Sequence, residues 1–296
     1  MKTIKIFAYA LAITSGFVFT SCGSDDSGGN DLPPIGGYNS ADEVGQANLV
    51  AYWSFDGNGK EELSGTNPST SANVTFSDAD AVKGDAASFN LGYLNYPTIA
   101  SLSNTLGSFT VSTWVKVANN GSNASVFFSL ARETDWSGNI NFMAETGWQP
   151  ATSDSLTVKG WINSTSDLGG QDTRNTIKVS AEDAATGHVA FPNKVGGQWA
   201  HAVLTYDGTT RMFRVYVNGV KISNPKWEER GAAGQMLTFN NPVHPVIGAF
   251  GSTASGSPID TWDKGLIGKL DEMRVWKVAL SQADIGFLYQ LESAGR

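Results

Sequence analysis

Five tryptophans in this chain fall in or beside polar loops, where an indole ring is available to a ligand; they are Trp136, Trp148, Trp161, Trp227 and Trp262. Sugar rings present C–H faces that stack on aromatic rings, while Asp, Asn and Arg side chains hydrogen-bond to hydroxyl groups. Two stretches combine both kinds of group, and they predict a carbohydrate-binding site made of Arg132, Asp135, Trp136, Glu145, Trp148 and Trp262. The alternative is that each tryptophan anchors its loop in the core, as large aromatic residues usually do.

Acidic residues offer weaker support for catalysis. Glycoside hydrolysis needs two carboxylates that flank the scissile bond. Glu133 and Asp135 are the nearest match, but no second glutamate follows them, and the pairs at 182–183 and 228–229 are adjacent, so they would point apart on a strand. His201 lies beside Trp199 in a core-type segment, which favours a structural histidine over a lyase residue. We therefore assign no catalytic residue, and a diverged glycoside hydrolase or polysaccharide lyase stays an alternative.

The N-terminus carries an export signal. Lys2 and Lys5 precede an apolar run over residues 6–19, which is shorter than the roughly 20 residues that span a bilayer. Residues 1–21 are therefore predicted to be a signal peptide. The sequence Phe-Thr-Ser-Cys at 19–22 resembles the bacterial lipobox, which implies that Cys22 is lipidated and anchors the protein to a membrane. The alternative is an ordinary signal peptide, but Cys22 is the one cysteine of the chain, so it has no disulfide partner.

Residues 22–46 are rich in Gly, Ser, Asp and Pro near their start, and they are predicted to form a flexible acidic tether. Ser24, Asp25 and Asp26 resemble the acidic signal that sends Bacteroidota lipoproteins to the outer face of the outer membrane. This resemblance implies an outer-membrane protein that faces the cell exterior. A solvated acidic linker with no targeting role is the alternative.

Net charge excludes one class of partner. The formal charge moves from -8 to -10 when the leader removes Lys2 and Lys5. An acidic chain with scattered Lys and Arg lacks the basic patch that nucleic-acid binding requires. It also lacks a basic amphipathic stretch for anionic lipid.

Alternating β-branched and aromatic segments recur from residue 49 to residue 276, including 109–117, 125–130, 176–179 and 200–206. Asn218-Gly219 between two such segments predicts a tight hairpin. One segment, 282–291, has a helical pattern, with Ser281 as its N-cap and an apolar stripe of Ile285, Leu288 and Leu291. Many strands with almost no helix indicate an all-β sandwich or barrel.

Six motifs in order resemble the laminin-G-like, concanavalin A-type jelly roll. They are residues 51–58 (AYWSFDGN), 84–89 (GDAASF), 108–116 (SFTVSTWVK), 198–208 (QWAHAVLTYDG), 216–219 (YVNG) and 266–281, which reads LIGKLDEMRVW and then ALS. The resemblance implies a two-sheet antiparallel jelly-roll sandwich over residues 47–296 with a short C-terminal helix. This fold hosts lectins, glycan-binding modules, adhesion modules and some hydrolases and lyases, so it does not settle function by itself.

The same resemblance implies a structural Ca²⁺ between the first and last strands. Asp56 follows the first strand and Asp271 lies within the last, while Asn58 and the backbone carbonyl of Gly92 could complete the oxygen ligands. The alternative is a plain turn at residues 56–59 and an ion pair at Asp271.

Together these features predict a non-catalytic, lectin-like surface lipoprotein. It would capture a polysaccharide or oligosaccharide for neighbouring glycan-uptake proteins. A protein-binding adhesion or scaffold module is the second interpretation.

Overall fold

Two units divide the chain, Met1–Pro33 and Pro34–Arg296. The computed structural model describes residues 32–132, 135–185, 188–241 and 243–296, and the elements below all belong to the second unit. Its thirteen strands are β1 Leu49–Trp53, β2 Thr70–Ser77, β3 Ala86–Asn95, β4 Phe109–Lys116, β5 Ser125–Arg132, β6 Asp135–Ala144, β7 Val158–Asn163, β8 Gly170–Arg174, β9 Ala200–Asp207, β10 Met212–Val217, β11 Val220–Lys221, β12 Val243–Ile247 and β13 Leu266–Trp276. Its α-helices are α1 Ala181–Ala185, α2 Gly251–Ala254 and α3 Gln282–Ser293.

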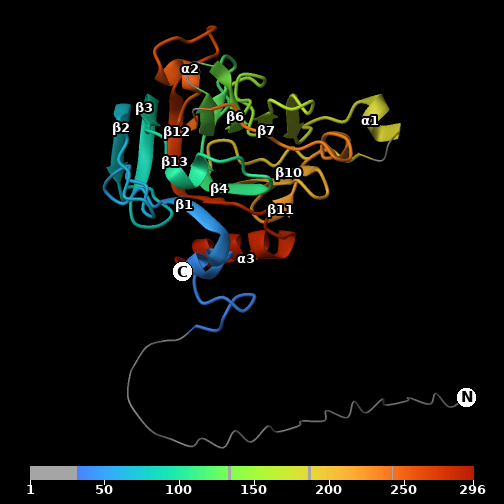
Figure 1. Ribbon diagram of the computed structural model, residues 1–296. Helices are drawn as coiled ribbons and strands as arrows, with labels where there is room; N and C mark the ends of the chain where they lie inside the picture. The colour runs from blue at the N-terminus through green and yellow to red at the C-terminus, as the bar shows by residue number, and fades with distance from the viewer. Residues whose placement is uncertain (1–31, 133–134, 186–187, 242) are drawn as a thin grey trace, which may run out of the picture. The chain divides into compact units, whose positions relative to one another are not determined.

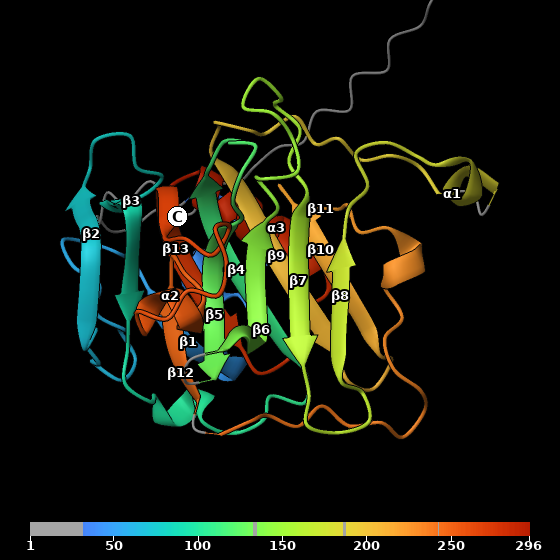
Figure 2. The same ribbon diagram turned by 90° about the horizontal axis from the view of Figure 1, so that it is seen from above.

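Every strand pair is antiparallel, and the strands follow one another in the order β11-β10-β9-β4-β13-β3-β12-β5-β6-β7-β8. β1 also pairs with β13, and β2 with β3. The sheet curls on itself, so that β5–β8 form one layer and β9, β10, β4 and β13 form another (Figures 1 and 2). The predicted jelly-roll sandwich is thus confirmed, with the refinement that hydrogen bonds join its two layers into one curled sheet.

The core lies between the two layers. At Gly160 on β7, a Cβ atom would come within 2.2 Å of Leu204 on β9 and 2.9 Å of Phe213 on β10. Glycine is therefore needed there because the layers approach so closely. The surrounding core is aromatic and aliphatic from both layers, and burial of that apolar surface is the main force that holds them together.

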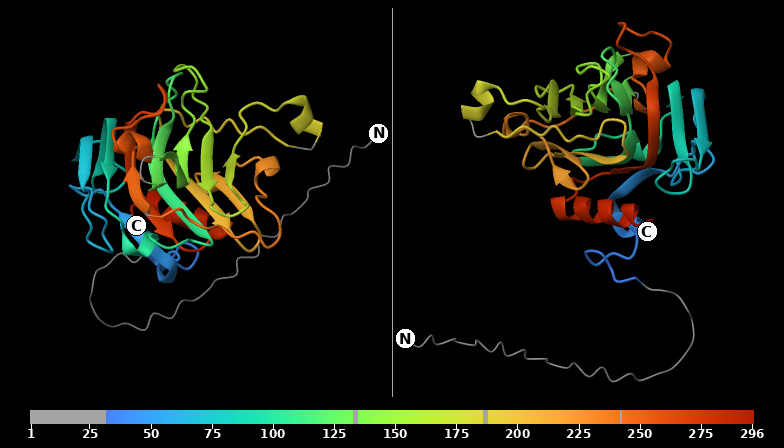
Figure 3. Two further views of the ribbon diagram at one scale, coloured as in Figure 1. Left: turned by 45° about the horizontal axis from the view of Figure 1, so that its top comes forward. Right: turned by 180° about the vertical axis from the view of Figure 1, so that it is seen from behind.

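α3 covers the outer face of the second layer (Figures 1 and 3). The Ser281 side chain accepts a hydrogen bond from the Asp284 backbone N–H at 3.1 Å, which confirms the predicted N-cap. The predicted stripe of Ile285, Leu288 and Leu291 is fully buried against Trp276 and other apolar residues of the sheet. This cover explains why β4 is buried on both faces although its sequence alternates.

Three local predictions have different outcomes. The Asn218-Gly219 hairpin is confirmed, since both residues have positive φ, 51° and 77°, between β10 and β11. The strand expected at 176–179 is wrong, because the Asn175 side chain binds Leu156 and Phe191 carbonyls and the ladder of β8 ends at Arg174. The tether expected at 22–46 cannot include residues 34–46, because Ala41 and Val44 are buried beside α3.

Candidate functional site

A cavity of about 350 Å³ opens on the outer face of β5, β6 and β7, on the side of the sandwich away from α3. Its walls are mainly aromatic, and few of its groups are charged. The lining residues are Ser122, Ala124, Trp136, Met143, Glu145, Gly147, Trp148, Lys159, Phe250 and Trp262. This combination of apolar walls and a few polar groups is typical of small-ligand sites.

A wide bulge in β6 brings Trp136 to the cavity. Leu130 pairs with Ile140 and Arg132 with Asp135, so residues 136–139 face a single residue of β5. The extra residues bend away from the ladder, and the Asn141 side chain closes the bulge with a 2.9 Å hydrogen bond to the Trp136 carbonyl. Ser137 fastens it to β7 by accepting hydrogen bonds from Trp161 Nε1 at 2.9 Å and Asn163 Nδ2 at 2.7 Å.

The segment after β12 supplies the facing part of the same wall. α2 packs on β5 and β6 (Figure 2). Phe250 and Trp262 stand edge-on to Trp136, with ring centroids 6.1 and 5.8 Å away. Asp263 holds this segment closed. Its buried carboxylate accepts hydrogen bonds from the Ser252 and Thr253 hydroxyls and, at 3.0 Å, from the backbone N–H of Ile259.

The other wall carries charge. Lys159 Nζ lies 2.6 Å from Glu145 Oε1, and both side chains are mostly buried. Trp148 lies beside Lys159, 5.3 Å from its ammonium to the ring centroid, and 52% of Trp148 is exposed. A flat exposed ring next to groups that donate and accept hydrogen bonds is suited to a sugar ring.

Four of the six predicted sugar-binding residues therefore meet in one cavity: Trp136, Glu145, Trp148 and Trp262. Arg132 and Asp135 do not line it, because they form an ion pair with each other at the end of the β5–β6 hairpin. Three further residues that line the cavity, Lys159, Met143 and Phe250, were not among those predicted from the sequence. Lys159 could have been found from its strand, since it occupies an outward position between the buried residues Val158 and Gly160. Nothing in the local sequence marks Phe250.

The other loop tryptophans have different places. Trp161 packs under Trp136 with 5.5 Å between ring centroids, so it supports the wall rather than lining it. Trp227 stacks on the guanidinium of Arg174 at 3.8 Å.

Acid groups at the cavity are few. Among the described residues that line it, Glu145 carries the only carboxylate, and Lys159 neutralises that carboxylate. Glu228 is bound to Lys221 and Ser223, and Glu229 to Arg211, both away from the cavity. His201 is completely buried, and burial, together with the nearby Arg274 charge, lowers its pKa to about 3.

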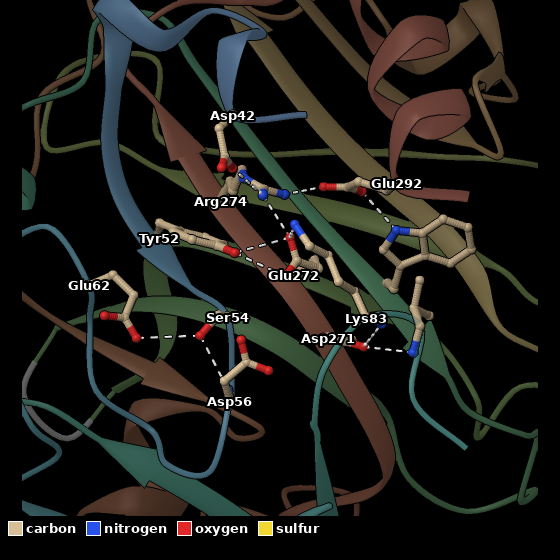
Figure 4. Close-up of polar contacts among 12 residues, drawn as sticks. Asp42, Tyr52, Ser54, Asp56, Glu62, Lys83, Asp271, Glu272, Arg274 and Glu292 are labelled. Atoms are coloured by element: carbon tan, nitrogen blue, oxygen red, sulfur yellow. Dashed lines mark hydrogen bonds and ion pairs between the residues drawn. The ribbon is translucent and has the colours of Figure 1, made fainter. Parts of the chain in front are cut away.

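Asp56 and Asp271, two of the predicted calcium ligands, bind the same turn between β2 and β3, and Figure 4 shows the contacts of Asp271. Asp56 Oδ1 accepts from the Asp85 N–H at 2.8 Å, and Asp271 Oδ2 accepts from the Val82 and Lys83 N–H groups at 2.8 and 3.1 Å. Asp271 Oδ1 is buried and has no hydrogen-bond partner among the described residues. Desolvation raises the pKa of Asp271 to about 7.

Asn58 and Gly92 fit that site less well. Asn58 folds back on its own turn, where its Oδ1 accepts from the Lys60 N–H at 2.8 Å. Gly92 pairs with Leu266, which lies about 16 Å from Asp271 along β13 at the usual strand rise. Gly92 therefore cannot share a coordination shell with Asp271, and that part of the predicted ligand set is wrong. Within the described residues, no group of three or more His, Cys, Asp or Glu side chains is placed to hold a metal.

A buried charge cluster lies next to Asp271 on β13 (Figure 4). Arg274 pairs with Glu272, with Glu292 of α3 and, at 3.0 Å, with Asp42. Trp114 Nε1 also donates to Glu292 at 2.7 Å. This network joins the first residues of the folded unit, the last strand and α3.

Cys22 and the acidic residues at 24–26 lie outside the described residues, so their predicted roles stay predictions. Among residues that the structure describes, no helix is long and apolar enough to cross a membrane.

Comparison with known proteins bears on the fold. The family model Laminin_G_3, described as concanavalin A-like lectin/glucanases superfamily, matches residues 90–286. No curated protein matches. Domain 4 of AbnA, an extracellular arabinanase from Geobacillus stearothermophilus solved in complex with arabinotriose, is similar with 20% identity and a TM-score of 0.50, over 82% of this chain and 98% of that one.

Two toxin domains are also similar. The binding domain of Paraclostridial Mosquitocidal Protein 1 has 14% identity and a TM-score of 0.52, over 82% of this chain and 52% of its own. The binding domain of botulinum neurotoxin serotype G has 12% identity and a TM-score of 0.54, over 82% and 51%. The chain thus spans about half the length of these two domains, and at such identities the likeness concerns the fold.

Proposed function

The chain belongs to the concanavalin A-like lectin/glucanase superfamily, and on that basis we propose that it is a non-catalytic glycan-binding protein whose site is the aromatic cavity. One observation carries the proposal: Trp136, Trp148 and Trp262, from three separate segments, converge on one cavity together with the Glu145–Lys159 pair. Aromatic walls with a few oriented polar groups are what sugar recognition needs. The arabinotriose complex of AbnA domain 4 supports the idea that a similar fold can hold a sugar.

Binding is favoured over hydrolysis because of the carboxylates. Both mechanisms of glycoside hydrolysis use two carboxyl groups about 5–9.5 Å apart. Glu145 is one such group and is held by Lys159, while the described part of the lining offers no second. We expect no release of reducing ends from a polysaccharide panel.

Retention on polysaccharide affinity gels tests the proposal, using the chain from Pro34 onward and the same chain with Trp148→Ala. Retardation by at least one polysaccharide, reduced by the substitution, is expected. If no gel retards the folded protein, the proposal is wrong. Capture of a membrane protein that is indifferent to Trp148→Ala would instead support the adhesion or scaffold role.

We propose further that Cys22 carries the lipid and that the protein faces the cell exterior, where it captures glycan for neighbouring uptake proteins. The lipobox-like residues 19–22 and the acidic residues 24–26 support this proposal. Labelled fatty acid should be incorporated into the full chain and not into Cys22→Ser, and protease added to intact cells should remove the domain. Labelling of the serine variant would contradict the anchor.

A calcium ion at Asp56 and Asp271 is also proposed. Its support is the buried, unpartnered Oδ1 of Asp271, since a cation would stabilise that carboxylate. The remaining ligands would be backbone carbonyls and water, which Ca²⁺ accepts readily. There the ion would join the β2–β3 turn to β13 and stabilise the folded state.

A further inference from the structure

Two cations stand directly opposite each other beside the cavity. Lys159 on β7 pairs in register with Arg174 on β8, so both side chains project from the same outer face of the sheet. Like charges at opposed positions destabilise a strand pair. Glu145 and Asp172 offset part of this repulsion, and an anion bound between the two cations would reduce it further.

Both cations also lie against the exposed wall of the cavity. The Arg174 guanidinium is 5.6 Å from the centre of the Trp148 ring, and the Lys159 ammonium is 5.3 Å from it. Trp227 stacks on the guanidinium at 3.8 Å, so Arg174 lies between two indoles and its plane is held in place. A sugar ring on Trp148 would bring its substituents next to both charges.

Positive charge exceeds negative charge at this place, although the whole chain has a net charge of -8. Glu145 pairs with Lys159, while Asp172 is shared between Arg174 and Arg230. Three cations thus face two carboxylates. Within the described part of the chain, Arg174 makes a side-chain hydrogen bond only through Nη1, which leaves its Nε and Nη2 donors available. Free guanidinium donors match the two oxygens of a carboxylate or sulfate.

We propose that the glycan is acidic, with an anionic substituent bound by Lys159 and Arg174 while its ring stacks on Trp148. The substituent is the carboxylate of a uronic acid or a sulfate ester, which share this recognition chemistry. The inference rests on the proposed glycan-binding function and narrows it to one class of ligand.

Two matched ligand pairs test it by titration calorimetry at low salt. Oligogalacturonate is compared with its methyl ester, and dextran sulfate with dextran, so each pair differs in charge and shares a backbone. Binding to the charged member should be at least about tenfold tighter, the effect of one good charge-assisted contact. It should also weaken as salt rises. A difference within the oligogalacturonate pair identifies a carboxylate as the bound group, and a difference within the dextran pair identifies a sulfate.

Substitutions at Lys159 and Arg174 test whether these two side chains cause the preference for the charged ligand. Lys159→Gln and Arg174→Gln should each lower affinity for the charged ligand by roughly tenfold, while Lys159→Arg should retain most of it. Lys178→Gln is the matched control, because Lys178 is exposed and lies outside the cavity. Thermal melting establishes that each variant is folded.

Equal affinity for both members of each pair would overturn the acidic-glycan inference and leave the glycan-binding function standing. The inference is also overturned if the two glutamine variants reduce neutral-glycan binding as much as charged-glycan binding. Failure of every glycan, neutral or charged, to bind would overturn the proposed function and the inference with it.

Discussion

The indole rings of Trp136 and Trp262 meet edge to face, with 5.8 Å between their centroids and 88° between their planes. One ring comes from a bulge in β6 and the other from the segment between α2 and β13. Neither element forms the wall without the other. The contact therefore links the shape of the cavity to two distant parts of the chain.

Replacing either ring should affect both binding and stability. Trp136 and Trp262 are partly buried in one apolar cluster with Phe250 and Met143. We expect Trp136→Ala or Trp262→Ala to lower glycan affinity at least tenfold and the free energy of unfolding by about 2 kcal/mol, less than a fully buried tryptophan would cost. Calorimetry and denaturant unfolding measure the two effects. Unchanged affinity in a folded variant would exclude the ring from the site.

Trp148→Ala should separate binding from stability. Because 52% of the side chain is exposed, its loss should change the free energy of unfolding by less than about 1 kcal/mol. Glycan affinity should nevertheless fall at least about tenfold, as for an aromatic ring that contacts ligand. Trp199→Ala is the matched control, since Trp199 is also partly exposed but does not line the cavity. Equal losses of affinity in the two variants would argue against a specific role for Trp148.

Asp263→Asn should weaken binding although Asp263 does not line the cavity. The amide keeps the size of the side chain but replaces one acceptor oxygen with an NH2 group, so it can no longer accept all three hydrogen bonds from the Ser252 and Thr253 hydroxyls and the Ile259 N–H. We expect a loss of about 1–3 kcal/mol in stability and a looser Trp262 wall. Tryptophan fluorescence measures the change around Trp262, and glycan titration measures the loss of affinity. Asp78→Asn, at an exposed aspartate that does not line the cavity, should leave affinity unchanged, and an equal effect there would contradict a positioning role for Asp263.

In the presence of a chelator, which removes calcium, Asp271 should make the stability of the folded protein depend on pH. Burial raises its folded-state pKa to about 7, above the usual value near 3.8. Between about pH 4 and 7 the folded protein therefore binds more protons than the unfolded chain, and Asp271 destabilises the fold as pH rises. Relative to wild type, Asp271→Asn should gain stability over this window by up to about 1.4 kcal/mol per pH unit. A difference that is flat with pH would show that Asp271 titrates normally.

Bound calcium should offset the destabilisation of the fold by the ionised Asp271. Added Ca²⁺ should raise the Tm of the wild type at pH 8, and a chelator should reverse the rise. The Asp271→Asn variant should respond much less, because one ligand charge is gone. Equal responses in the two proteins, or none in either, would contradict a cation at Asp271.

The Arg274 cluster should be structural. Glu292→Ala leaves Arg274 buried without its α3 partner, and breaking such a pair typically costs about 3–5 kcal/mol. Glycan affinity should be unchanged at temperatures where the variant is folded, since α3 lies across the sandwich from the cavity. Glu182→Ala, at an exposed glutamate, is the control and should change neither property. A loss of affinity in folded Glu292→Ala would show coupling between the two faces.

Local pattern was sufficient for much of the fold. Alternation identified β4 and β9, the Asn218-Gly219 pair identified the β10–β11 hairpin, and Ser281 identified the start of α3. These features depend on side-chain periodicity and turn chemistry within a few residues, so the sequence states them directly. The lipid on Cys22 is a prediction of the same local kind.

Which residues line the cavity depended on contacts between strands that are distant in the sequence. Arg132 and Asp135 have the right chemistry, but the β5–β6 register makes them partners of each other. Lys159 and Arg174 look like scattered surface charges until the β7–β8 register sets them side by side. Trp136 reaches the cavity only because four residues bulge opposite one. The sequence by itself thus determined the jelly roll and the kind of residues proposed to bind sugar. Strand register decided which of them meet, since a shift of one residue turns every side chain to the other face.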